Sequence, residues 1–189
     1  MAISELDLAI DKTMAALTQP GQILELDTIN KFGVDLPVFK NAPQNVADYL
    51  AYFCQQNADK EFLVDGDIRL TFGETYAAAR TLAGGLVEGY GVQKGDRIGI
   101  AARNSANWVI LDMAITIAGG VSTKLNGWWQ GDELADGIED VGCRYVFADY
   151  QRAQRLVESK RDHGAELLVF EHDKMPLEGL KVMLEKGGG

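Results

Sequence analysis

The chain has 189 residues, of which 47% are hydrophobic, a share that supports a folded core and argues against a disordered segment. Its formal net charge of −10 argues against nucleic acid or an anionic membrane as the main partner, because both attract basic surfaces. No apolar run approaches the roughly 18 residues that a membrane span needs, so no transmembrane segment is predicted. We therefore expect an acidic cytoplasmic protein with one large domain or two small ones.

Residues 1–43 are predicted to form an N-terminal extension. Its apolar residues recur at helical spacing, which predicts an amphipathic helix from Ile3 to Leu17. The acidic residues of this helix favour packing or a dimer contact over a lipid surface. We expect a short strand at 22–26 and a loop at 30–43, where glycine and proline interrupt any period.

Residues 44–189 are predicted to alternate strands with helices. The expected helices cover 45–56, 71–88, 104–117, 131–141, 150–161 and 176–184. The expected strands cover 62–64, 68–70, 97–102, 121–125, 144–148 and 167–170. Thr71 and Glu74 fit a capping box at the start of the second helix. This order predicts an α/β fold, a largely parallel sheet with helices on both faces and an antiparallel hairpin at its start.

The cysteines and glycines are expected to be structural. Cys54 and Cys143 lie among apolar neighbours, which predicts buried free thiols rather than a disulfide or a metal pair. The two histidines join no cluster with ligand spacing, so no metal site is predicted. The pair Gly84-Gly85 falls inside a helix and is expected to permit close packing, since neither common nucleotide-binding glycine pattern is present.

Two acidic pairs are also expected to be structural rather than catalytic. Asp65 and Asp67 flank a glycine between two apolar runs, which predicts a hairpin turn. Asp132 and Glu133 begin a helix, where the free amides and the helix dipole favour carboxylates.

Several short motifs resemble the adenylate-forming, or AMP-binding, superfamily of the acyl-CoA synthetase type. They are Leu70-Thr71-Phe72 with Glu74, Gly95-Asp96-Arg97-Ile98, Arg103-Asn104-Ser105 with Trp108, and Ile117-Ala118-Gly119-Gly120. The resemblance covers roughly residues 45–170, and the order of the motifs carries it. It implies the N-terminal subdomain of an ATP-dependent acyl-CoA ligase. The full-length enzyme would use ATP, Mg²⁺ and CoA to convert a carboxylic or fatty acid into its acyl-CoA.

The family's reactive residues are absent from this chain. The Ser/Thr/Gly-rich loop that cradles the ATP phosphates, the Asp that holds the ribose and the C-terminal catalytic Lys all lie downstream in relatives. The resemblance therefore implies a subdomain truncated before the phosphate loop, with no catalytic residue of its own. Its partners would be the missing downstream subdomains of the same enzyme. Gly187-Gly188-Gly189 is read as a loop that continues beyond this sequence.

One ligand contact is implied by the resemblance. In relatives of the acetyl-CoA synthetase type, a loop equivalent to Asn126-Gly127-Trp128 and basic residues near Arg152 and Arg155 contact the nucleotide end of CoA. The alternative for the two arginines is a solvated helix that also carries Glu158 and Lys160. Trp128 and Trp129 are predicted to pack in the core or at a subdomain boundary, or else to contact the acyl or pantetheine group.

Lys124 departs from the family, which usually has proline at this position. The lysine is expected either at a solvated edge or at the rim of a divergent pocket.

Two other functions remain open. The chain could be a standalone binding or dimerisation module that has lost the catalytic half, in which case the N-terminal extension would suit a homodimer. Within the superfamily, it could belong to an enzyme that loads a carrier protein or to a luciferase-like oxygenase.

Overall fold

A computed structural model describes residues 4–174 of the chain. The chain divides into two compact units, Met1–Asn45 and Val46–Gly189. The helix expected at 176–184 lies outside the described residues. Within the described residues, no helix is long and apolar enough to cross a membrane.

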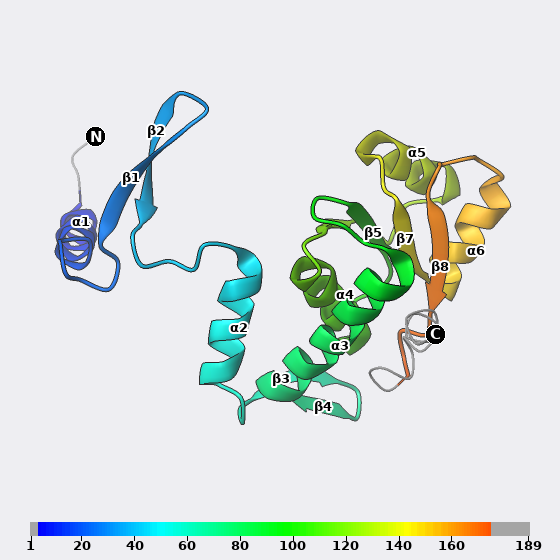
Figure 1. The fold of residues 1–189 in the computed structure, drawn as a ribbon, viewed down its shortest axis with the longest axis horizontal. Coiled ribbons are helices and arrows are strands. Elements are labelled where there is room, and N and C mark those ends of the chain that lie inside the picture. The colour runs from blue at the N-terminus through cyan, green and yellow to red at the C-terminus, as the bar shows by residue number, and fades with distance from the viewer. Residues whose placement is uncertain (1–3, 175–189) are drawn as a thin grey trace. The chain divides into compact units, whose positions relative to one another are not determined.

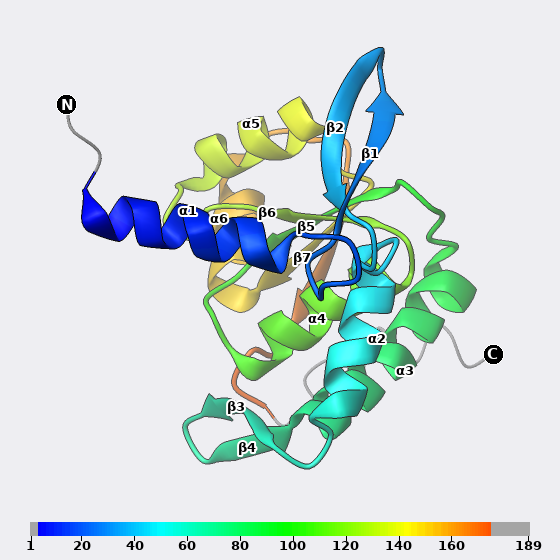
Figure 2. The same cartoon turned by 90° about the vertical axis from the view of Figure 1, so that its left-hand side faces the viewer.

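The first unit contains one helix and one hairpin. Helix α1 (Glu5–Leu17) confirms the predicted N-terminal helix and is followed by strands β1 (Leu26–Lys31) and β2 (Val34–Phe39) (Figure 2). A capping box begins α1, because the Ser4 hydroxyl accepts from the Asp7 amide and the Asp7 carboxylate accepts from the Ser4 amide. None of residues 4–45 is buried.

The hairpin corrects two predictions, the strand at 22–26 and the loop at 30–43. Strands β1 and β2 pair antiparallel around a two-residue turn formed by Phe32 and Gly33. Both turn residues have positive φ, 55° and 79°, as a type I′ turn requires. Pro37 lies inside β2, which is tolerated because each strand of a two-stranded sheet has a free edge.

The second unit alternates helices and strands as predicted. Its helices are α2 (Val46–Gln56), α3 (Phe72–Tyr90), α4 (Ala106–Ile117), α5 (Gly131–Val141) and α6 (Tyr150–Ser159). Its strands are β3 (Glu61–Asp65), β4 (Ile68–Thr71), β5 (Arg97–Ala101), β6 (Val121–Lys124), β7 (Tyr145–Asp149) and β8 (Glu166–Phe170). The β3–β4 hairpin forms as predicted, but it is a separate two-stranded sheet and does not begin the parallel one.

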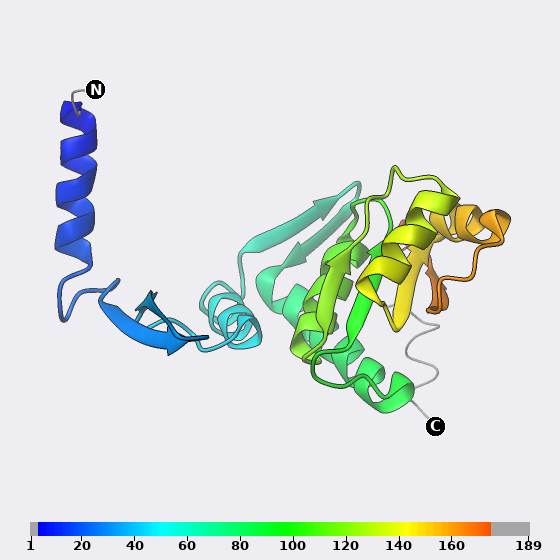
Figure 3. The ribbon, with the colours of Figure 1, turned by 90° about the horizontal axis from the view of Figure 1, so that it is seen from above.

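The central sheet has the strand order β6-β5-β7-β8, and every pair in it is parallel. Helices α3 and α4 cover one face, and α5 and α6 lie beside each other on the opposite face (Figures 1 and 3). The predicted α/β fold with helices on both faces is therefore confirmed.

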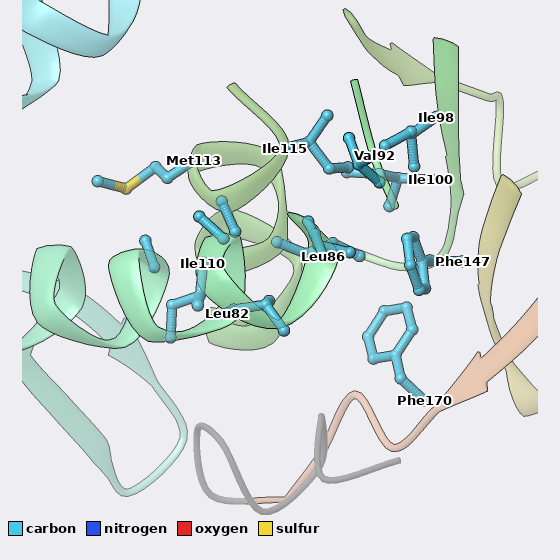
Figure 4. Packing of buried hydrophobic residues seen from close by; sticks show 14 of the residues in the cluster. Leu82, Leu86, Val92, Ile98, Ile100, Ile110, Met113, Ile115, Phe147 and Phe170 are labelled. Atoms are coloured by element: carbon cyan, nitrogen blue, oxygen red, sulfur yellow. The ribbon is translucent and has the colours of Figure 1, made fainter. Parts of the chain in front are cut away.

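Two apolar clusters hold these layers together. The larger one joins α3 and α4 to one face of the sheet. Leu82 and Leu86 of α3, Ile110 of α4 and Phe147 of β7 belong to it, and none of them is accessible to solvent (Figure 4). The second cluster lies under α5 and α6 and includes Leu134. Burial of each large apolar side chain stabilises the fold by about 1.5–3 kcal/mol.

Helix α3 confirms its predicted start and corrects one expectation about its glycines. Thr71 and Glu74 form the predicted capping box, and the helix ends at Gly91 in the left-handed conformation with φ 61°. Gly85 is buried, but a Cβ placed on Gly84 would meet nothing within 4 Å. Gly84 therefore does not mark a close contact.

Both cysteines are free and buried, as the sequence predicts. Burial raises the pKa of the Cys54 thiol and that of the Cys143 thiol, because the low-polarity surroundings disfavour the thiolate.

Candidate functional site

A pocket of about 850 Å³ opens at the carboxyl ends of β5, β6 and β7. The connections that leave the neighbouring strands β5 and β7 run to opposite sides of the sheet, so α4 and α6 begin on opposite faces. Open α/β sheets bind their ligands at such a switch point. The lining residues are Ala102, Arg103, Asn104, Trp108, Lys124, Leu125, Asn126, Gly127, Trp128, Trp129, Gln151, Arg152 and Arg155.

All five predicted site residues line this one pocket. Asn126, Gly127 and Trp128 come from the loop after β6, whereas Arg152 and Arg155 come from α6. The structure thus brings together two segments that are 24 or more positions apart in the sequence.

The loop after β6 carries two tryptophans in different environments. The Asn126 Oδ1 accepts from the Trp128 amide at 3.0 Å, which closes a local turn, and Trp128 is 84% exposed. Trp129 is half-buried against the second core cluster. A Cβ on Gly137 of α5 would lie 2.6 Å from the Trp129 ring, so glycine there makes room for the indole. Core packing, one of the two predicted roles, therefore describes Trp129 and not Trp128.

Arg152 is buried and is bound to protein groups. Its Nε donates to the Gly127 carbonyl at 2.8 Å, and its Nη1 lies 3.0 Å from the Asp149 Oδ2. The fraction of the Arg152 side chain that is exposed is 9%. The alternative prediction of a solvated helix face is therefore wrong for this residue.

Arg155 is half-buried and also binds the loop. Its Nη1 donates to the Gly127 carbonyl at 3.2 Å and to the Trp129 carbonyl at 3.0 Å. Both arginines therefore satisfy backbone acceptors of the loop after β6.

Asp149 is a residue of the site that the sequence analysis missed. It is 1% exposed and begins α6, where its Oδ1 accepts from the Arg152 amide at 3.0 Å. Its Oδ2 accepts from the Arg103 amide in the loop after β5, also at 3.0 Å. The available signal was an Asp directly before a helix, which is a common N-cap pattern.

The pocket has a cationic lining on an acidic chain. Four basic residues line it, Arg103, Lys124, Arg152 and Arg155, and none of its lining residues within 4–174 is a carboxylate. Lys124 pairs with Asp112 at 2.8 Å, and Arg152 pairs with Asp149. In the described part of the chain, neither Arg103 nor Arg155 makes an ion pair.

Lys124 lies on the pocket wall, and its side chain is 52% exposed. Lys124 was expected either at a solvated edge or at a pocket rim, and the structure shows both.

The acidic pairs occupy structural positions. Glu133 accepts from the Gln130 amide at 2.8 Å at the start of α5, as predicted for a helix N-terminus. Asp65 lies at the predicted hairpin turn, and its Oδ2 also accepts from the Ala106 amide at 2.9 Å, at the start of α4. Among residues 4–174, no group of three His, Cys, Asp or Glu side chains is placed to hold a metal ion.

A model of the family "AMP-binding enzyme" matches residues 50–185, which is more than half of the chain. The chain belongs to the AMP-binding enzyme family. A mitochondrial medium-chain acyl-CoA ligase of Pongo abelii is 34% identical over 103 residues, which cover 53% of this chain and 17% of the relative. The 4-coumarate–CoA ligase 3 of Arabidopsis thaliana is 33% identical over 101 residues, which cover 52% of this chain and 18% of the relative. The chain thus spans less than a fifth of these relatives.

Solved structures agree on the fold. A benzoate CoA ligase from Burkholderia xenovorans LB400 superposes with a TM-score of 0.64 at 22% identity, over 76% of this chain and 28% of that protein. The N-terminal domain of FACL13 from Mycobacterium tuberculosis gives a TM-score of 0.65 at 19% identity, over 76% of this chain and 36% of that one. The fold is therefore that of the N-terminal subdomain of adenylate-forming CoA ligases.

Proposed function

We propose that this chain is the N-terminal part of an ATP-dependent acyl-CoA ligase for a carboxylic or fatty acid. The observation that carries the proposal is the family match over residues 50–185, which begins near the start of the second unit. The names of the curated relatives, a medium-chain acyl-CoA ligase and a 4-coumarate–CoA ligase, support this class of reaction.

The proposed reaction of the full-length protein has two steps. The substrate carboxylate attacks the α-phosphate of ATP, which yields an acyl-adenylate and pyrophosphate. The CoA thiolate then attacks the acyl carbon, and AMP leaves. Positioning and charge stabilisation around the phosphates supply most of the rate enhancement in phosphoryl-transfer sites.

We propose that the pocket described here takes the nucleotide end of CoA, with Asn126, Gly127, Trp128, Arg152 and Arg155 as its site residues. The charge on Arg155 supports the fit, because guanidinium groups bind phosphate strongly. The neighbouring Arg103, which makes no described ion pair, adds to that charge. The exposed indole of Trp128 offers a face on which an adenine ring can stack. Binding to this chain alone is expected to be weak.

The described residues of this chain offer no group that suits ATP or Mg²⁺, in contrast to the pocket proposed for CoA. The sequence holds no Gly-rich phosphate loop, and no described group of side chains suits a metal ion. We propose that downstream subdomains supply these groups and that the 189-residue chain does not turn over by itself.

The first test measures AMP release by the purified chain with ATP, Mg²⁺, CoA and a panel of carboxylic acids. We expect no release above background. Robust turnover would refute the proposal that downstream subdomains supply the groups that the reaction needs.

The second test measures CoA and dephospho-CoA binding by ligand-observed NMR, since the two differ only in the 3′-phosphate. Arg155→Gln should reduce the preference for CoA. Arg80→Gln, an exposed arginine of α3 that does not line the pocket, is the matched control and should leave the preference unchanged. An unchanged preference in Arg155→Gln would refute its proposed phosphate contact.

A standalone module that forms a homodimer is the second candidate. It is favoured by the exposed apolar side chains of the first unit, including Leu6 at 69%, Ile10 at 51% and Phe32 at 94%. Light scattering after size exclusion should then show a dimer at high concentration, and Ile10→Asp should shift it to the monomer. A monomer at every concentration would rule this candidate out.

We also propose a cytoplasmic location, which the acidic composition supports, although the medium-chain relatives are named as mitochondrial. Fractionation of the source cells tests it, and recovery of the protein with an organelle would refute it.

A further inference from the structure

We propose that Arg152 is a positioning residue, anchored by Asp149, that fixes the loop carrying Trp128 and does not itself bind a ligand phosphate. Only the second of the two experiments below, which uses CoA as the probe, rests on the proposed function. It assigns the two arginines of α6 to different roles, although sequence spacing treats them alike.

The hydrogen bonds of Arg152 support this role. Its Nε is occupied by the Gly127 carbonyl, and its Nη1 lies within reach of Asp149 at 3.0 Å and of the Gln151 side chain at 3.3 Å. The side chain is nearly inaccessible, so turning it toward a ligand would leave the 1% exposed Asp149 carboxylate without its cation. Such an unpaired buried charge is strongly unfavourable.

Asp149 connects the three loops that surround the pocket. Its carboxylate accepts from the Arg103 amide after β5 and from the Arg152 amide at the start of α6. Through the Arg152 side chain, it also holds the Gly127 carbonyl after β6. One buried carboxylate therefore sets the relative positions of all three loops.

Gly127 provides a separate observation that the loop is held against this pair. A Cβ on Gly127 would lie 3.3 Å from the Ala102 carbonyl oxygen and 3.4 Å from the Arg152 Nε. The loop backbone thus lies between the end of β5 and the Arg152 guanidinium, and an added Cβ would approach the Ala102 carbonyl oxygen closely.

The first experiment records the indole N–H resonances of Trp108, Trp128 and Trp129 in the ¹⁵N-labelled chain, with each assigned by a Trp→Phe variant. Arg152→Lys keeps the charge but cannot hold Asp149 and Gly127 with one planar group. We expect Trp128 and Trp129 to shift or broaden. Trp108 also lines the pocket, but it packs against the larger apolar cluster, so a resonance that stays sharp and dispersed reports an intact fold. Asp149→Asn should have the same effect, and Arg80→Lys should have none.

Two results for Arg152→Lys would contradict the positioning role in this experiment. Unchanged Trp128 and Trp129 resonances in Arg152→Lys would show that the loop does not depend on the guanidinium. Loss of all three resonances in Arg152→Lys would show that the residue supports the whole fold and not the loop. If only Asp149→Asn unfolds, the Arg152→Lys spectrum decides the question.

The second experiment compares CoA with dephospho-CoA in the same variants. A positioning role predicts that Arg152→Lys weakens both ligands equally, by about tenfold, the change that corresponds to one charge-assisted hydrogen bond. The ratio of the two affinities should stay at the wild-type value. A ratio that falls toward one in Arg152→Lys or Arg152→Gln would instead make Arg152 a phosphate contact.

The two experiments separate failure of the inference from failure of the proposed function. If the wild-type chain binds neither CoA nor dephospho-CoA, the proposed CoA pocket is refuted. The indole resonances still decide whether Arg152 holds the loop, because they need no ligand.

Discussion

Two glycine-to-alanine substitutions should change stability in opposite directions. A Cβ on Gly131, the first residue of α5, would collide with the Arg155 carbonyl oxygen and lie 2.9 Å from the Ser159 Cβ of α6. The backbone oxygen cannot rotate away, so the two helices must separate, at a cost of about 1–3 kcal/mol. Gly84 lies inside α3 with nothing within 4 Å of the added Cβ. There, alanine should stabilise the helix by about 1 kcal/mol.

Urea unfolding followed by circular dichroism measures both effects. We expect the free energies of unfolding of Gly84→Ala and Gly131→Ala to differ by roughly 2–4 kcal/mol, the sum of the two contributions. In a thermal scan, each kcal/mol should correspond to about 2–4 °C for a chain of this size. The reasoning about helix packing would be refuted if Gly131→Ala were neutral or if Gly84→Ala were the more destabilising variant.

Three further substitutions test the fold, each by urea unfolding. Thr71→Ala removes the capping box of α3 and should cost about 1 kcal/mol, whereas Thr81→Ser, at an exposed position of the same helix, should have little effect. Leu82→Ala leaves a cavity at a fully buried position and should cost about 2–5 kcal/mol; a loss below 1 kcal/mol would contradict the packing shown in Figure 4. The Gln93 amide and the Arg144 guanidinium lower the pKa of Asp96 below its ordinary 3.8, so Asp96 stabilises the folded state above that pH. The stability advantage of wild type over Asp96→Asn should shrink as pH falls through 3.8 and below, and an advantage independent of pH would refute this linkage.

The order of elements in the second unit could be predicted from local signals. Thr71, Ser105 and Gly91 mark helix ends through hydrogen-bonding and conformational preferences that act within a few residues. The buried strands β5 and β7 appear as short apolar runs, which indicate a parallel sheet when helices separate them. These features need no knowledge of distant contacts.

The hairpin of the first unit was missed for a local reason. Phe32 occupies a turn position with φ 55°, which phenylalanine rarely adopts, so Phe32-Gly33 does not resemble the usual Asn-Gly turn. Pro37 argued against a strand because proline is excluded from the interior of larger sheets. The alternating apolar residues Val34, Leu36 and Val38 were the signal that could have found its second strand.

The site was predictable as a set of residues but not as a network. Helical spacing indicates that Arg152 and Arg155 share a face, yet it cannot show that both bind the carbonyl of Gly127, more than twenty positions earlier. The Asp149 contact with the Arg103 amide spans 46 positions, and that of Asp65 with the Ala106 amide spans 41. Such contacts depend on how the sheet places its loops, which only the three-dimensional structure reveals.

The most direct test of the central claim is to sequence the source gene beyond the codon for Gly189. The account predicts an open frame that continues into a Ser/Thr/Gly-rich loop ending in Lys-Gly, the family's cradle for the ATP phosphates. A stop codon directly after Gly189 would contradict the claim that this chain is the N-terminal part of a ligase, and would leave binding or assembly as its function.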